Sequence, residues 1–173
     1  MNNTVGVGSI LTILHDQHVR TRELLHQVAD ASGPDVESRP GRLPMHPVRQ
    51  AVEARDTAAI EAMLAEDVVF TSPVAFKPYP GKAITAAILR AVLRVFEDFR
   101  YVREIAGADG RDHAFVFTAT VNGRRVDGCD FLHFDDDGLI DDFMVMVRPL
   151  SGATALAEAM GAQFEQIARE AAA

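Results

Sequence analysis

Three turn signals in the second half of the chain most constrain how it can fold. They lie between apolar runs and are Asp109-Gly110, Asn122-Gly123 and Asp137-Gly138. Asp-Gly and Asn-Gly pairs favour the tight turns that join antiparallel strands, because these residues tolerate positive φ. The predicted strands that they connect cover residues 99–106, 113–121, 126–134 and 140–148. The sequence therefore predicts a four-stranded antiparallel meander.

The third of these strands carries a carboxylate, Asp130, among apolar residues. Alternation places it on one strand face with four other residues, Val126, Gly128, Leu132 and Phe134. A buried carboxylate must be paired, hydrogen-bonded or protonated, because an isolated ionised one is costly to desolvate. We expect the apolar surroundings to raise the pKa of Asp130 above that of an exposed aspartate.

Four further elements are predicted before the meander. A short helix begins at His46-Pro47, and a second helix, capped by Asp56, ends at Glu66-Asp67. A strand over 68–72, a Pro- and aromatic-rich loop over 73–81 and a long helix over 82–96 follow. After the meander, an alanine-rich helix covers residues 151–171. Helices followed by an antiparallel meander indicate an α+β fold.

Composition limits the classes of function. At 173 residues with 48% hydrophobic content, the chain suits one domain with appendages. A formal charge of −8 gives no electrostatic footprint for nucleic acid or an anionic membrane. The single cysteine, Cys129, excludes an internal disulfide and fits a reducing compartment. No run reaches membrane-spanning length and no signal peptide is predicted, so we expect a cytoplasmic protein.

The N-terminal residues are predicted to stand apart from the core. An amphipathic helix is expected over 1–30, a Pro- and Gly-rich linker over 31–45, the main domain over 46–150 and a C-terminal helix over 151–173. The segment ILHDQHVRTRELLHQVADASG resembles the first helix of hemerythrin-type domains, which implies an iron-ligand position at His18. The histidine and glutamate segments that complete such a di-iron site do not follow, so we predict no metal and no other cofactor.

Residues 46–150 resemble the SnoaL-like branch of the nuclear transport factor 2-like (NTF2-like) superfamily. The resemblance rests on VEARDTAAIEAMLAEDVVFTSPV, PYPGKAI and FDDDGLIDDFMVMV, and on the order of these segments. It implies a cone-shaped fold in which a curved antiparallel sheet wraps around helices and leaves an internal cavity. It also invites comparison with three groups of enzymes: ketosteroid isomerases, polyketide cyclases and limonene-type epoxide hydrolases.

The enzymes with defined catalytic groups match this chain poorly. In steroid isomerases a protonated aspartate lies on the third meander strand, where this chain has Asp130. Their general base falls at Ser72 and their oxyanion-hole tyrosine at Val48, so two of three groups are missing. The epoxide hydrolases need an arginine between two acids, but the corresponding strand centres are apolar here. The cyclases need one acid in a hydrophobic cone, which Asp130 with Tyr79, Tyr101 or His113 would satisfy.

We therefore predict a protein that binds a small, mostly apolar molecule in a cone-shaped cavity. Isomerase- or cyclase-type turnover assisted by Asp130 as the catalytic acid is a hypothesis, against which stands an Asp130 that only hydrogen-bonds a neighbour. The expected ligand-binding residues are Phe70, Ser72, Tyr79, Tyr101, Phe117, Leu132, Met144 and Met146.

The alternative is a non-catalytic, dimeric ligand-binding or assembly module. Its interface would be the outer sheet face, which strict alternation equips with four apolar residues, Phe131, Phe143, Val145 and Val147. A homodimer is compatible with both readings, because one sheet face can line the cavity while the other pairs. Whether the chain is an enzyme remains open at this point.

Overall fold

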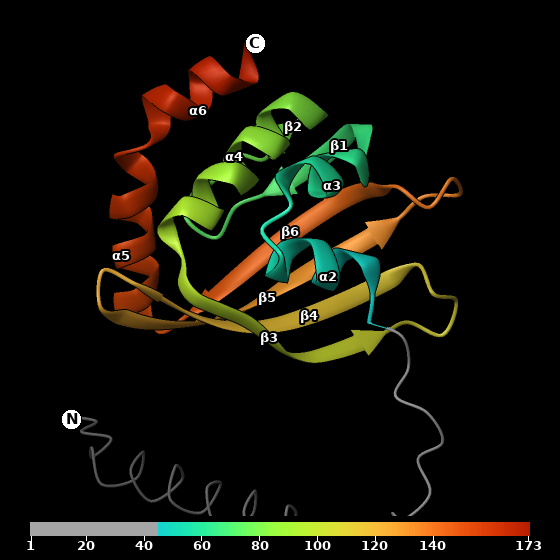
Figure 1. Ribbon diagram of the computed structural model, residues 1–173, viewed down its shortest axis with the longest axis horizontal. Coiled ribbons are helices and arrows are strands. Elements are labelled where there is room, and N and C mark those ends of the chain that lie inside the picture. The colour runs from blue at the N-terminus through green and yellow to red at the C-terminus, as the bar shows by residue number, and fades with distance from the viewer. Residues whose placement is uncertain (1–44) are drawn as a thin grey trace, which may run out of the picture. The chain divides into compact units, whose positions relative to one another are not determined.

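The computed structural model describes residues 45–173, which form one six-stranded sheet and five helices (Figure 1). The predicted helix over 1–30, with His15 and His18, and the predicted linker lie outside the described residues, apart from Met45. The elements in chain order are α2 (Pro47–Glu53), α3 (Thr57–Ala62), β1 (Leu64–Thr71), β2 (Tyr79–Pro80), α4 (Lys82–Val95), β3 (Glu97–Ala106), β4 (Asp112–Val121), β5 (Arg124–Phe134), β6 (Ile140–Arg148), α5 (Leu150–Gly161) and α6 (Phe164–Ala171).

The sheet has the strand order β2-β1-β6-β5-β4-β3. Strands β3 to β6 form the predicted antiparallel meander, and β1 joins its edge by parallel pairing with β6. Asn122 and Gly123 both have positive φ, 48° and 72°, as a tight two-residue hairpin turn requires. The curved sheet holds α2, α3 and α4 against its inner face, with α5 and α6 at one end (Figure 1). The predicted α+β, NTF2-like cone fold is confirmed.

The short helices follow their predicted caps, but α3 ends earlier than expected. The Asp56 side chain accepts a hydrogen bond of 2.9 Å from the Ala59 amide, and Pro47 lies in the first turn of α2. The prediction extended α3 to Glu66-Asp67, whereas β1 already begins at Leu64. Leu64 is fully buried and pairs with Ile140, so pairing with β6 overrides the local helical pattern.

A bulge in β6 corrects the predicted faces of that strand. His133 of β5 pairs with Asp142, and Phe134 pairs with Ile140, so Asp141 is an extra residue. Both Ile140 and Phe143 therefore face the interior, and every following side chain lies on the face opposite to the one predicted. Three residues assigned to the outer face point inward instead, namely Phe143, Val145 and Val147.

The outer face consequently carries the two methionines that were predicted to line the cavity. Met144 pairs with Phe131 and Met146 with Cys129, so all four lie on the outer side of the sheet. Met146 is 55% exposed and Phe131 is 37% exposed. The assignment of Met144 and Met146 to the inner wall was wrong, because strict alternation does not survive an inserted residue.

The core lies between the inner face of the sheet and α4. Its largest fully buried side chains include Phe115, Phe117, Leu64 and Ile140. At the C-terminal end, Glu170 of α6 bonds Arg90 of α4 at 3.1 Å, and Arg90 also bonds Glu61 of α3 at 2.9 Å. These ion pairs hold α6 beside α4. None of the helices in residues 45–173 is long and apolar enough to cross a membrane.

We expect the core to fold without the N-terminal residues. Residues Pro44–Ala173 form one compact unit by their internal contacts. A chain that starts at Leu43 should keep a cooperative thermal transition, because the sheet and its covering helices are complete without residues 1–42. Calorimetric melting of the truncated and full chains tests this expectation. Precipitation of the truncated chain, or loss of its cooperative transition, would contradict it.

Candidate functional site

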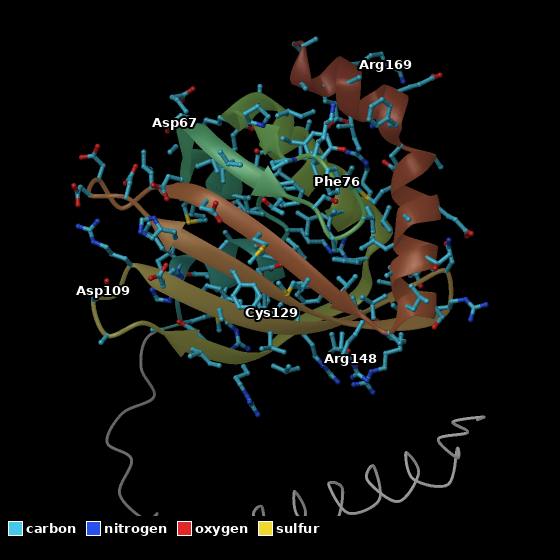
Figure 2. The ribbon with its side chains drawn as sticks, turned by 180° about the vertical axis from the view of Figure 1, so that it is seen from behind. Asp67, Phe76, Asp109, Cys129, Arg148 and Arg169 are labelled. Carbon is cyan, nitrogen blue, oxygen red and sulfur yellow. The ribbon has the colours of Figure 1, made fainter. Side chains whose placement is uncertain are left out.

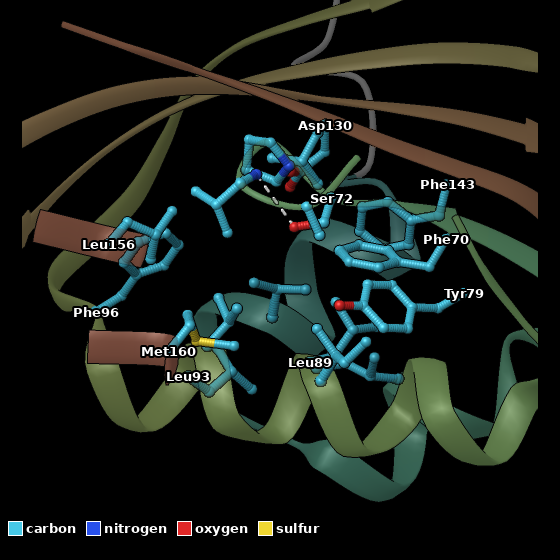
Figure 3. A pocket seen from close by; sticks show the side chains of 18 of the residues that line it. Phe70, Ser72, Tyr79, Leu89, Leu93, Phe96, Asp130, Phe143, Leu156 and Met160 are labelled. Atoms are coloured by element: carbon cyan, nitrogen blue, oxygen red, sulfur yellow. Dashed lines mark hydrogen bonds between the residues drawn. The ribbon is translucent and has the colours of Figure 1, made fainter. Parts of the chain in front are cut away.

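A cavity of about 250 Å³ lies between the inner face of the sheet and the helices (Figure 3). Its walls are mostly apolar and come from α2, α3, α4, α5, α6 and five strands. Aromatic rings dominate the sheet side, where Phe70 meets Phe143 edge-on at 5.5 Å and Phe99 lies 5.1 Å from Phe117. A cavity of this composition favours a small apolar molecule.

Asp130 is the one aspartate or glutamate that lines this cavity within the described residues. It lies in the middle of β5, opposite Val145 of β6 and Phe115 of β4, and it is 6% exposed. Val145 lines the cavity beside it, and Phe115 is fully buried in the core. The carboxyl group is therefore largely removed from water on an otherwise apolar wall.

Tyr101 supplies the hydrogen-bond partner of Asp130. Its hydroxyl group donates to Oδ2 of Asp130 at 2.6 Å. Tyr101 belongs to β3, which is separated from β5 by β4, so its side chain reaches across one strand. Ring contacts hold it in this position, with centroids 4.9 Å from Phe99 and 5.4 Å from Phe115. The Tyr101–Asp130 pair is thus fixed by the tertiary fold.

Burial controls the protonation of this pair. Desolvation raises the pKa of Asp130 to about 7, although the hydrogen bond from Tyr101 works in the opposite direction. Desolvation and the neighbouring Asp130 charge raise the pKa of Tyr101 well above its usual value. Near neutral pH, Asp130 therefore exchanges a proton easily while Tyr101 keeps its own. This direction for Asp130 agrees with the expectation from the sequence.

The structure brings most of the predicted site residues together. Asp130, Tyr101, Phe70, Phe117, Ser72 and Tyr79 all line the cavity. Leu132 faces the same side of β5 as Asp130, but it packs into the core opposite Phe143 and does not line the cavity. Its predicted ligand contact is therefore wrong, as are those of Met144 and Met146 on the outer face.

His113 is not a partner for Asp130. Its ring lies 4.5 Å from that of His46 in a separate cleft, where its Nδ1 is 3.7 Å from a carboxylate oxygen of Glu104. Residues 45–173 contain no group of three or more side chains placed to hold a metal ion. The polar groups of the cavity wall are therefore the Tyr101–Asp130 pair and the hydroxyl groups of Ser72 and Tyr79.

Several lining residues were not assigned to the site from the sequence. The helical ones form the apolar stripe of α4, including Ile84, Ile88 and Val92, which periodicity predicted as a buried face. Phe96 and Phe99 follow this helix and close the wall near Tyr101. Periodicity identifies such residues as inward-facing, but it does not distinguish a packed core from a cavity wall.

Comparisons with known proteins place this geometry in context. A sequence profile described as the SnoaL-like domain matches residues 48–143. A solved steroid delta-isomerase from Pseudomonas aeruginosa is 47% identical, with a TM-score of 0.65, over 68% of this chain and 85% of that chain. An uncharacterised protein with a cystatin-like fold from Silicibacter pomeroyi is 36% identical, with a TM-score of 0.67, over 71% and 86% of the two chains. No curated protein matches the chain.

Proposed function

The chain belongs to the SnoaL-like family of the NTF2-like superfamily, and on that premise we propose that its cavity binds a small, mostly apolar molecule bearing a carbonyl group. The observation that supports this most is the buried hydrogen bond between Tyr101 and Asp130 in an apolar cavity. The two groups together can offer a hydrogen-bond donor to a ligand oxygen. The apolar walls hold the rest of the molecule.

The roles of the two residues differ in this proposal. The Tyr101 hydroxyl hydrogen is directed to Oδ2 of Asp130, so it is not free for the ligand. Protonated Asp130 donates its own acid hydrogen to the carbonyl oxygen, and Tyr101 is a positioning residue that holds the carboxyl group. As negative charge develops on the ligand oxygen, a donor fixed in a dry cavity stabilises it. Asp130 is thus the proposed catalytic acid of an isomerase- or cyclase-type reaction.

The Pseudomonas aeruginosa relative is called a steroid delta-isomerase, which makes ketones the first ligands to test. We do not extend that reaction to this chain. Ser72 stands where the steroid isomerases have their general base, and a serine cannot accept such a proton at neutral pH without a base beside it. The lining residues include no second carboxylate and no histidine within the described part of the chain.

Calorimetric titration with small apolar ketones and lactones tests the proposal. We expect at least one class to bind, and Asp130→Asn to weaken it by roughly tenfold, because a charge-assisted or acid hydrogen bond is replaced by a weaker one. The matched control is Asp127→Asn on the same strand, since Asp127 pairs with Arg125 and Arg148 at the surface. Absence of heat with every class, or equal losses in the two variants, would count against the proposal.

An assembly role has its own support in the exposed apolar residues of the outer sheet face. Ile105, Ala114, Phe131 and Met144 follow one another across four strands, and Ile105 is 54% exposed. We expect the protein to form a homodimer through this face, because a contiguous apolar sheet surface is poorly suited to water. Dimerisation would leave the cavity on the opposite face free.

Light scattering checks the dimer. The parent should scatter as a dimer at micromolar concentration, and Phe131→Glu should shift it to a monomer without loss of secondary structure. Val74→Glu is the control, because Val74 is similarly exposed, at 37%, but belongs to the loop beside the cavity. A parent that is monomeric under these conditions would exclude this interface.

A further inference from the structure

The cavity has a second polar position, formed by the hydroxyl groups of Ser72 and Tyr79. Both side chains point into the cavity (Figure 3), from the residue after β1 and from β2. The Ser72 oxygen accepts a hydrogen bond of 3.2 Å from the Val74 amide, so its own hydrogen remains to be donated. Within residues 45–173, the Tyr79 hydroxyl group has no hydrogen-bond partner either.

The strand register fixes where this second position lies relative to Asp130. Thr71 of β1 pairs with Met144 of β6, so the next residue, Ser72, stands beside Val145. Val145 in turn pairs with Asp130 of β5. Ser72, Val145 and Asp130 therefore form one row across the inner face, and all three line the cavity.

Two strand spacings separate the backbones of Ser72 and Asp130, which is about 10 Å. The wall between the two polar positions is apolar, because Val145 lies in the row and Phe143 lies beside it. The two polar positions are thus separate binding points with an apolar interval between them. A ligand with a single oxygen function can satisfy only one of them.

We infer that the natural ligand carries two oxygen functions at opposite ends of a rigid apolar frame. A carbonyl group meets the Tyr101–Asp130 pair, and a hydroxyl or second carbonyl group accepts a hydrogen bond from Ser72. This inference rests on the proposed function and narrows its ligand class. It also gives Ser72 a role in binding in place of the general base that it cannot supply.

Two bicyclic ketones that differ by one hydroxyl group test the inference by calorimetry. The probes are trans-2-decalone and its 6-hydroxy derivative, in which the hydroxyl group lies on the ring opposite the ketone. We expect the parent to bind the hydroxy-ketone roughly fivefold more tightly, because one additional hydrogen bond contributes about 1 kcal/mol. Ser72→Ala should abolish this difference without changing the affinity for decalone itself.

Two matched variants keep the result interpretable. Ser72→Thr retains a hydroxyl group and should retain the preference for the hydroxy-ketone. Thr71→Ala removes a hydroxyl group from the adjacent residue, whose side chain lies on the outer face opposite Met144, and should leave both affinities unchanged. Asp130→Asn should weaken both ligands alike, since both carry the ketone.

The outcomes separate this inference from the proposed function. If decalone binds in an Asp130-dependent manner but the hydroxy-ketone gains nothing, or Ser72→Ala weakens both ligands equally, the second polar position is wrong and the proposed function stands. If the parent binds neither ketone, both are wrong for this class of ligand. A selective loss in Ser72→Ala that Ser72→Thr does not show supports the two-ended ligand.

Discussion

The Asp130→Asn variant is expected to gain stability relative to the parent by about 4 kcal/mol as the pH rises from about 4 to about 8. The gain follows from the difference between the folded pKa of Asp130, about 7, and its ordinary value of 3.8. Each unit of that difference corresponds to about 1.4 kcal/mol. Asparagine keeps the shape of the side chain and can accept the hydrogen bond from Tyr101, but it does not titrate.

The sign follows from which state holds the proton more tightly. Below the unfolded pKa, both states of the parent are protonated and the stabilising effect of the raised pKa is fully present. As the pH rises through this window, the unfolded chain releases its proton while the folded carboxyl group keeps it, so the native state loses stability. Above about pH 7 the folded group is ionised as well, and the penalty becomes constant.

Urea unfolding of both proteins across this pH range measures the effect. The difference between their free energies of unfolding should change steadily with pH and level off near neutrality. Asp127→Asn, which removes a surface carboxylate from the same strand, should show no comparable change. A flat difference would mean that Asp130 is an ordinary ionised carboxylate, and the case for it as a protonated acid would be lost.

The sequence located Asp130 but not the partner that defines its chemistry. Asp130 was found because strand alternation and the flanking turns are local patterns, and the hairpin at Asn122-Gly123 fixed the register around it. Tyr101 was one of three candidates, since its contact with Asp130 depends on how far β3 curves over β4. Local patterns contain no information about such a reach across an intervening strand.

The faces of β6 were missed for a related reason. The residues Phe143 to Val147 alternate as expected, and only the choice of inner and outer face was wrong. That choice depends on Asp141, which the pairing of β5 with β6 leaves without a partner residue. In isolation, the sequence of β6 is equally compatible with either face, because both alternating sets are apolar. Pairing with β5 and β1 decides between them.

Gly128→Ala is expected to destabilise the protein by roughly 1–3 kcal/mol. Gly128 pairs with Phe117 on the inner face, and the Phe117 ring occupies the space above it. A Cβ atom at residue 128 would lie 2.7 Å from Cε1 of that ring and closer still to Cζ. The ring cannot retreat freely, because it is 1% exposed and packs against Phe96 and Phe99.

The same change should lower the affinity for any cavity ligand. Phe117 lines the cavity beside Tyr101, at a centroid distance of 6.4 Å, so a displaced ring moves into the space that the ligand needs. Alanine is otherwise a better strand residue than glycine. A loss of stability in this variant therefore reports the collision with Phe117 and not the backbone.

A second substitution distinguishes this cause from a general effect on β5. Phe117→Leu in the Gly128→Ala background should recover part of the lost stability, although Phe117→Leu alone destabilises the parent by opening space. Gly161→Ala in α5 is the control, since a Cβ atom there meets nothing within 4 Å and should be neutral or stabilising. Additive losses in the double variant would show that Gly128 is not there to accommodate the Phe117 ring, because two residues in direct conflict must couple when one of them is made smaller.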